Sequence, residues 1–149
     1  MIKIKLKKII KNNKKIELPT YATKGSGAID LFAYLDKKLH LEPNEVQLIN
    51  TGISVYIENN SYAGLIIPRS GIGHNHGIVL GNLVGLIDSD YQGEIKISCW
   101  NRGSKSYVIS PGDRIAQMLI IKVEKVEFDI VESFQKTSRN LQGFGHTGK

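Results

Sequence analysis

The sequence has very little cysteine and no long hydrophobic run. Cys99 is the single cysteine in 149 residues, so an intrachain disulfide framework is excluded. No apolar run approaches the roughly 20 residues that a membrane-spanning helix needs, and no apolar stretch of signal-peptide length follows the lysine-rich start. These absences predict a protein in the cytoplasm without a membrane partner, and a Cys99 that is buried as a small hydrophobe. A length of 149 residues, of which 41% are hydrophobic, predicts one compact domain.

The formal charge of +6 is concentrated at one end of the chain. Seven lysines lie within the first fifteen residues, where Ile2, Ile4 and Leu6 alternate with three of them. This alternation is typical of an edge strand with a solvated lysine face. No aromatic residues interleave with the lysines to stack on bases, so we expect an edge strand and no nucleic-acid partner. Only the net charge favours the alternative, a basic nucleic-acid-binding protein.

Short strand-like segments dominate the rest of the chain. Runs rich in β-branched residues occupy 46–57, 63–67, 94–100 and 114–131, and glycine and proline separate them at close intervals. This pattern predicts an all-β sandwich, jelly roll or barrel with at most one short helix, after Pro68. From Gln135 onward the apolar periodicity stops. We therefore expect a single β domain over 1–134 and a mobile C-terminal arm over 135–149.

Residues 81–97, GNLVGLIDSDYQGEIKI, contain the most informative acidic positions. Two apolar strands flank an acidic, glycine-containing connection, which predicts a β-hairpin. Asp88 and Asp90 are ordinary turn residues on one interpretation. On the other, a carboxylate polarises water while the ring of Tyr91 forms a wall against a sugar-like ligand.

Residues 67–78, IPRSGIGHNHGI, suggest a phosphate site. The guanidinium of Arg69 and the hydroxyl of Ser70 precede a glycine-flanked loop whose backbone amides can complete an anion cradle. The Gly-Lys-Ser/Thr ending of a P-loop is absent. His74 and His76 have no further ligand nearby at metal-site spacing, so we do not expect them to bind a metal.

Two further segments carry candidate ligand contacts. In GDRIAQMLI, Arg114 and Gln117 stand three residues apart, and in a regular strand their side chains face opposite sides. One of them is then structural and the other reaches a ligand, and periodicity does not choose between them. The tail segment RNLQGFGHTG, 139–148, combines a cation, an aromatic ring and glycines, and can fold over a bound phosphate ligand.

Five segments in this order resemble the five motifs of the trimeric dUTPase family. They are GAIDLFAY (27–34), PRSGIGHNHGI (68–78), GLIDSDYQGEI (85–95), GDRIAQMLI (112–120) and RNLQGFGHTG (139–148). The resemblance covers nearly the whole chain, from about residue 19 onward. It implies a jelly-roll-like β subunit in a homotrimer whose active sites lie at subunit interfaces, each drawing on all three chains. The implied reaction is the hydrolysis of dUTP to dUMP and pyrophosphate.

The resemblance also implies a role for each site residue. Asp88 is the general base for a water that attacks the α-phosphorus. Asn82 and the hairpin backbone hold the uracil, and Tyr91 packs against the deoxyribose. Asp30 belongs to the acidic surroundings of the metal and phosphate site. Four further substrate-binding residues lie on the phosphate side: Arg69, Ser70, Gly71 and Gln117. The acidic connection contributes Asp90. The closing arm contributes Arg139, Phe144, Gly145, His146 and Thr147, and the ring of Phe144 stacks over the uracil.

Elementary chemistry agrees with this implied substrate. Backbone amides and carbonyls have fixed polarity, so they distinguish uracil from cytosine, and a ring pressed on the sugar excludes a 2′-hydroxyl. The implied cofactor is Mg²⁺, held mainly by substrate phosphates and water rather than by protein ligands. The implied cellular role is to prevent incorporation of uracil into DNA and to supply dUMP for thymidylate synthesis.

Two other functions fit parts of the same pattern. A dCTP deaminase resembles the same fold family, but the FGHTG ending and the short chain favour the triphosphatase. A non-catalytic binding or signalling module would keep the nucleotide pocket but is expected to have lost Asp88 or Arg69, and both are present.

Overall fold

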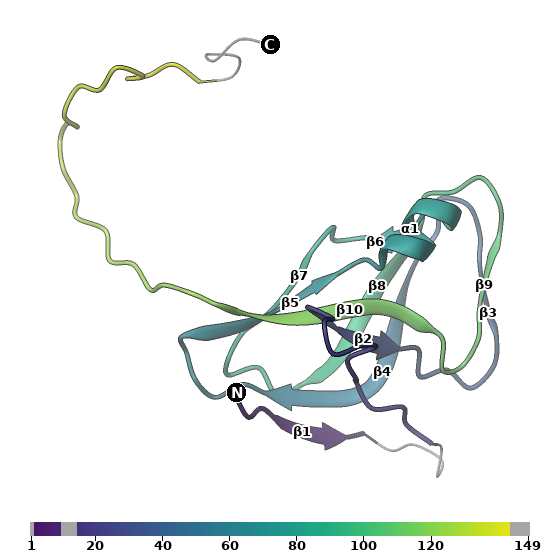
Figure 1. Ribbon diagram of the computed structural model, residues 1–149. Helices are drawn as coiled ribbons and strands as arrows, with labels where there is room; N and C mark the ends of the chain where they lie inside the picture. Colours follow the sequence, from purple (N-terminus) through teal and green to yellow (C-terminus); the bar gives the residue numbers. More distant parts are fainter. Residues whose placement is uncertain (1, 10–14, 144–149) are drawn as a thin grey trace.

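The computed structural model describes residues 2–9 and 15–143, which form ten strands and one helix (Figure 1). In chain order the elements are β1 (Lys5–Lys8), β2 (Ile29–Phe32), β3 (Leu39–Leu41), β4 (Val46–Tyr56), β5 (Tyr62–Ile67), α1 (Ser70–His76), β6 (Ile78–Leu80), β7 (Gly85–Ile87), β8 (Glu94–Asn101), β9 (Tyr107–Ile109) and β10 (Arg114–Lys122). The predictions of an all-β fold and of one short helix after Pro68 are confirmed.

The strands form three antiparallel sheets. One has the order β1-β4-β8-β6, the second has the order β2-β10-β5-β7, and β3 and β9 form a small two-stranded sheet. The side chains between the sheets form one core that includes Leu31, Ile53, Ile97 and Met118. Cys99 is fully buried in this core, as predicted. Burying this apolar area is the main force that holds the sheets together.

Strand β1 lies at the edge of its sheet, where it pairs only with β4 among the described strands. All four of its residues are exposed, and its lysines face solvent, with Lys5 paired to Glu58 at 2.7 Å. The prediction of an edge strand with a solvated lysine face is therefore confirmed. An edge covered with lysine resists pairing with other edges, because like charges repel.

A bulge at Gly52 bends the long strand β4. The β4–β8 register shifts between Asn50 and Ser54, and Gly52 has φ +70°, a conformation that glycine adopts without strain. A β-carbon at Gly52 would lie 2.9 Å from the ring of Tyr34. The bulge therefore depends on glycine for both its backbone angle and its packing.

Residues 123–143 continue beyond β10 without helix or strand and extend away from the sheets in Figure 1. Their apolar side chains are largely exposed, among them Phe128 at 86% and Ile130 at 94%. These residues bury almost nothing within their own chain. Among the described residues, the β core therefore positions the site.

Candidate active site

Asp30 lies at the centre of a charged cluster drawn from two strands and the loop between β5 and α1. It is on β2 and is 8% exposed, and its two carboxylate oxygens accept from different arginines. Arg69, directly after β5, donates its Nε to Oδ1 at 2.9 Å, and Arg114 of β10 donates Nη1 to Oδ2 at 3.1 Å. Arg69 also donates Nη1 to the Arg114 carbonyl at 3.1 Å. One carboxylate therefore orients two guanidinium groups side by side.

Gln117 joins the same cluster because β10 is irregular. The register of β10 against β2 shifts between Arg114 and Ala116, so a regular alternation of faces does not continue across that point. As a result, Arg114 and Gln117 line the same cavity. The expectation that they face opposite sides was wrong, and the bulge is the reason. The Gln117 amide donates to the Pro68 carbonyl at 2.9 Å, which ties β10 to the start of α1.

Helix α1 begins at this cluster. Its N-cap residue is Arg69, with φ −85° and ψ 133°, and no side chain caps this end of the helix. Ser70 and Gly71 in the first turn are exposed. The first N–H groups of a helix have no partner within the helix, so here they remain available to an anion.

These residues surround one cavity of about 240 Å³. Its lining consists of a loop before β2, the Asp30 cluster and the start of α1: Ala22, Ser26, Gly27, Ala28, Asp30, Arg69, Ser70, Gly71, Arg114 and Gln117. We call it the phosphate cavity. The structure thus brings together the predicted residues Asp30, Arg69, Ser70, Gly71 and Gln117. It adds Arg114, which the sequence left open, and the loop at Ser26, for which the sequence gave no signal.

The second group of predicted residues lies in the segment from β6 to β8. Asn82 is in the turn between β6 and β7, where its carbonyl accepts from the Val84 amide at 2.7 Å. Asp88 and Asp90 are exposed after β7, and the Asp88 carbonyl accepts from the Tyr91 amide at 3.2 Å. The Tyr91 hydroxyl donates to the Glu94 carbonyl at 3.0 Å, so the ring is held while its residue remains 43% exposed.

The hairpin predicted for 81–97 was wrong. Strand β7 pairs with β5, whereas β8 pairs with β4 and β6, so the strands on either side of the acidic connection belong to different sheets. The connection from Asp88 to Gly93 crosses from one sheet to the other. Gly93 lies against Tyr91, and a β-carbon there would overlap the tyrosine hydroxyl. Local alternation signals strands, but it does not say which strands pair.

Within one chain the two groups form separate halves. The phosphate cavity is lined by none of Asn82, Asp88, Asp90 and Tyr91. Arg139 lies in the segment after β10, where its Nε donates to the Gln142 carbonyl at 3.0 Å. The predicted arm residues Phe144, Gly145, His146 and Thr147 lie outside the described residues.

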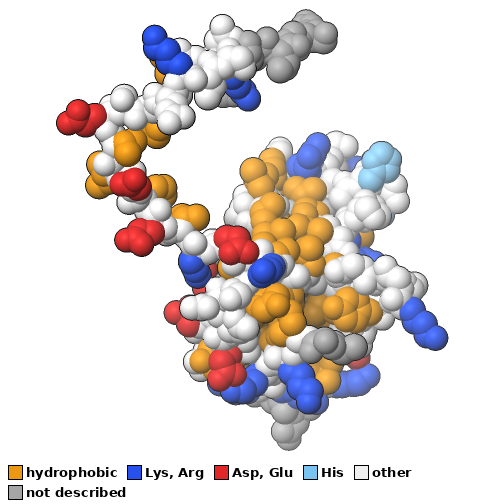
Figure 2. Space-filling view, turned by 60° about the vertical axis from the view of Figure 1, so that its left-hand side comes forward, with side chains coloured by type: hydrophobic (Ala, Val, Ile, Leu, Met, Phe, Trp, Pro, Cys, Tyr) orange, Lys and Arg blue, Asp and Glu red, His pale blue; other side chains and the backbone are white. Residues whose placement is uncertain are grey.

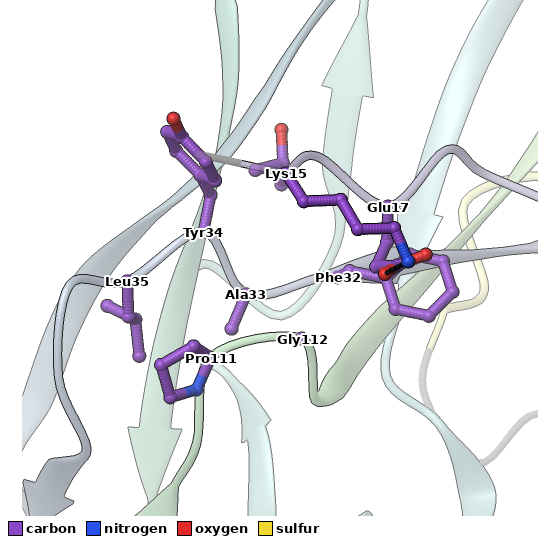
Figure 3. Close-up of a pocket in the computed structure, with 9 residues that line it drawn as sticks. Lys15, Glu17, Phe32, Ala33, Tyr34, Leu35, Pro111 and Gly112 are labelled. Carbon is purple, nitrogen blue, oxygen red and sulfur yellow. Dashed lines mark ion pairs between the residues drawn. The ribbon is translucent and has the colours of Figure 1, made fainter. Parts of the chain in front are cut away.

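A further cavity of about 240 Å³ lies beside the turn that joins β9 to β10 (Figure 3). Phe32, Tyr34 and Pro111 form part of its wall, and Lys15 pairs with Glu17 at one side at 2.7 Å. None of the predicted site residues lines it. Its charged side chains already neutralise each other, so it offers little to a charged substrate.

Two groups with raised pKa values, Cys99 and Tyr107, lie outside the phosphate cavity. Burial raises the pKa of the Cys99 thiol to about 11, which keeps it protonated and unreactive near neutral pH. Burial also raises the pKa of Tyr107. Across residues 2–9 and 15–143, no three His, Cys, Asp or Glu side chains cluster as metal ligands. No helix in the described part of the chain has the length and apolar character to cross a membrane.

Known proteins resemble this chain over most of its length. The family model described as dUTPase matches residues 14–148. The deoxyuridine 5'-triphosphate nucleotidohydrolase of Idiomarina loihiensis is 59% identical over 134 residues, covering 90% of this chain and 89% of the relative. That of Coxiella burnetii is 56% identical over 132 residues, covering 89% and 87%. The solved structure of the Staphylococcus bacteriophage 80alpha dUTPase with dUPNHPP has a TM-score of 0.86 and 26% identity, and covers all of both chains.

Proposed function

This chain belongs to the dUTPase family, and from that premise we propose how its residues hydrolyse dUTP to dUMP and pyrophosphate. The observation that carries the proposal is the pair of arginines on Asp30 beside the exposed first turn of α1. Two guanidinium groups, a hydroxyl and helix amides suit a triphosphate, because the single carboxylate of Asp30 leaves the cluster with an excess positive charge that an anionic ligand would neutralise.

On the phosphate side, Arg69, Ser70, Gly71 and Gln117 bind the triphosphate. Arg69 uses its Nε and one Nη1 hydrogen within the chain, so its remaining N–H groups can donate to phosphate oxygens. Asp30 acts as a positioning residue, because both of its oxygens hold arginines in place. A guanidinium that is already oriented loses less conformational entropy when substrate binds.

Asp88 is the general base. It takes a proton from a water molecule while the water oxygen forms a bond to the α-phosphorus. The bond from the α-phosphorus to the bridging oxygen breaks, and pyrophosphate leaves with that electron pair. The exposure of Asp88 after β7 supports this role, because an exposed carboxylate has access to water.

Asn82 and the backbone around it bind the uracil, and Tyr91 packs on the deoxyribose. Backbone amides and carbonyls have fixed polarity, so a turn that pairs with uracil would leave cytosine unpaired. The hydrogen bond from Tyr91 to Glu94 holds the ring in place, so that it excludes a 2′-hydroxyl by overlap. Asp90 belongs to the same binding surface, two residues beyond Asp88.

The residues of the phosphate cavity suit Mg²⁺ that enters the site already bound to the triphosphate. Both oxygens of Asp30 are engaged by arginines, and the lining of the phosphate cavity is otherwise cationic or neutral. Such a lining suits an anion that brings its own cation, because Mg²⁺ prefers phosphate oxygens and water. Bound to the substrate, Mg²⁺ neutralises phosphate charge and holds the triphosphate in one conformation.

A homotrimer would join the two halves of the site across subunit interfaces. Apolar side chains beside the acidic connection are exposed, including Leu83 at 69% and Leu86 at 59%. Figure 2 shows hydrophobic side chains gathered on the body next to the departing tail, and more of them along the tail among acidic residues. Exposed apolar area of this extent favours burial against further copies of the chain.

The arm from 135 to 149 closes over a neighbouring site. Arg139 adds a cation toward the phosphates, and Phe144 stacks over the uracil, while Gly145, His146 and Thr147 complete the cover. Closure excludes water from the reacting phosphate and adds contacts only while substrate is bound. In a cytoplasmic setting, this activity would keep uracil out of DNA and supply dUMP for thymidylate synthesis.

Pyrophosphate release from a panel of nucleotides tests the proposed function. dUTP should be turned over, while dTTP, dCTP and UTP should react poorly, because overlap or unpaired polar groups oppose each competitor. Excess chelator should abolish most of the activity, since the charge of the triphosphate is then not neutralised. Comparable turnover of UTP would refute the role of Tyr91. Release of ammonia from dCTP would indicate a deaminase instead.

A further inference from the structure

A second polar cavity lies at the other end of α1 from the phosphate cavity. It has a volume of about 440 Å³ and lies between the last turn of the helix and the loop that joins β8 to β9. No residue lines both cavities. The lining is Gly73, His74, Asn75, His76, Gly77, Arg102, Gly103, Ser104, Lys105, Ser106 and Tyr107. The mechanism proposed above uses none of these side chains.

The floor of this cavity is a close contact between two glycines. A β-carbon on Gly77 would lie 2.6 Å from the Gly103 nitrogen, and one on Gly103 would lie 2.6 Å from the His76 carbonyl oxygen. The Arg102 amide also donates to the Gly77 carbonyl at 3.0 Å. Only hydrogen side chains permit this approach, so the helix end and the loop are held at a fixed spacing.

A buried asparagine fixes the loop from below. Asn101 is fully buried, and its side-chain amide donates to the carbonyls of Leu41 and Lys105 at 2.8 Å each. Its side-chain oxygen accepts from the Gly103 amide at 2.9 Å. The loop therefore has its shape before any ligand binds, which lowers the entropic cost of binding.

The cavity lining is cationic and rich in donors. Arg102 and Lys105 carry full positive charges, His74 and His76 add ring nitrogens, and no acidic side chain lines the cavity. The rings of His76 and Tyr107 contact each other at 5.1 Å between centroids, tilted by 44°, which holds His76 at the wall. Glu42 accepts from the Ser106 hydroxyl at 2.9 Å, but Glu42 does not line the cavity.

We propose that this cavity is a second phosphate-binding site, which takes a small polyphosphate anion. Two cationic side chains on a loop of fixed backbone, together with hydroxyl groups and backbone amides in a concave frame, are the groups that bind phosphate oxygens. The concave shape and its volume fit a compact ligand of the size of pyrophosphate better than an extended nucleic-acid strand, which needs a groove with stacking aromatics. The seven residues of α1 span about 10 Å, so both sites can be filled at once.

Calorimetric titration of the full-length protein with inorganic pyrophosphate tests this proposal. A saturating non-hydrolysable dUTP analogue and Mg²⁺ first fill the site that holds Arg69. Wild-type protein should then bind about one further pyrophosphate per chain. The double variant Arg102→Gln, Lys105→Gln should bind it at least about tenfold more weakly, because both full charges of the cavity are gone. The matched control Lys37→Gln, Lys38→Gln removes two exposed lysines elsewhere and should bind normally.

Histidine NMR spectra give an independent measurement on the wild-type protein. Adding pyrophosphate to the analogue-saturated protein should shift the imidazole signals of His74 and His76, which line the cavity, and leave that of His40 in place. Failure to bind pyrophosphate beyond the analogue, displacement of the analogue, or equal affinity of the double variant and the control would each overturn the proposal. Tighter binding of a single-stranded oligonucleotide through Arg102 and Lys105 would overturn the choice of a small ligand.

Discussion

Asp88 is an exposed carboxylate, and its proposed role depends on its charge and basicity rather than on its packing. Asp88→Asn keeps the size and hydrogen-bonding reach of the side chain but cannot take a proton from water. We expect turnover to fall by at least about a hundredfold, while affinity for a non-hydrolysable dUTP analogue changes little. Steady-state pyrophosphate release and analogue titration measure the two effects separately.

Asp90→Asn is the control for this variant, since Asp90 is an exposed carboxylate in the same connection. It should keep far more of the turnover than Asp88→Asn, because the role proposed for Asp90 is in binding and not in proton transfer. If Asp88 is only a turn residue, Asp88→Asn should also keep near-normal turnover, because Asn serves in turns about as well as Asp. That result would end the assignment of Asp88 as general base, whichever way Asp90→Asn behaves.

The Cys99 thiol should make stability depend on alkaline pH. Burial raises its pKa from 9.0 to about 11 in the folded protein, so the unfolded chain ionises first. Its contribution is complete below pH 9 and is lost as the pH rises through 11, by roughly 2 to 3 kcal/mol. Urea unfolding should show this loss in wild type and not in Cys99→Ala. Parallel pH profiles for the two proteins would show that the folded thiol ionises normally.

Sequence motifs can identify the charged residues of the site, but they do not show which of these residues form pairs. Asp30 and Arg69 were identified through motifs, but their ion pair joins positions 39 residues apart, and no local pattern encodes it. Arg114 was left undecided because regular alternation separates it from Gln117. The bulge that brings both to one cavity arises from strand pairing and not from the residues in between.

At the scale of elements, the end of α1 depends on Gly77. This residue has φ +72°, and its amide donates to the Gly73 carbonyl, which closes the helix. Gly77→Ala places a β-carbon 2.6 Å from the Gly103 nitrogen, which is backbone and cannot move away cheaply. We expect the free energy of unfolding to fall by at least about 2 kcal/mol, from the backbone angle and the overlap together. Thermal and urea unfolding measure this loss.

Gly25→Ala is the matched control, because a β-carbon there has nothing within 4 Å and its φ is not in the left-handed region. It should change stability by less than about 0.5 kcal/mol. Equal stability of the two variants would mean that the helix end and the β8–β9 loop adjust to each other. The inference that the second phosphate-binding site has a fixed shape would then be wrong as well.

The elements that the sequence predicted correctly are those with strong local signals. Alternation identified the edge strand β1, and the close spacing of glycine and proline excluded long helices. The hairpin at 81–97 was wrong because pairing is decided by the two sheets as wholes: β7 completes the sheet of β5, and β8 is central to the other sheet. Side-chain alternation is the same in either arrangement.

At the scale of the whole molecule, the separation of the two half-sites is the observation that sequence reasoning alone could not supply. The phosphate cavity and the acidic connection belong to one chain, yet the residues of the second do not line the first. Motif order along a chain gives no distance between motifs. In the proposed homotrimer, assembly with further copies would bring the two halves together, and the exposed side chains of Leu83, Phe128 and Ile130 would give that assembly apolar area to bury.

The arm should be needed for turnover but not for folding or assembly. The last strand ends at Lys122, and the described part of the arm, 135–143, makes only local contacts such as Arg139 with Gln142. We expect removal of 139–149 to leave thermal unfolding and the trimer mass in light scattering unchanged. Turnover should fall by at least about tenfold, because water is no longer excluded from the reacting phosphate. Removal of Lys149 alone is the control and should have no effect. Unchanged kinetics after removal of 139–149 would show the arm to be incidental, and a monomer that retains activity would refute the shared site.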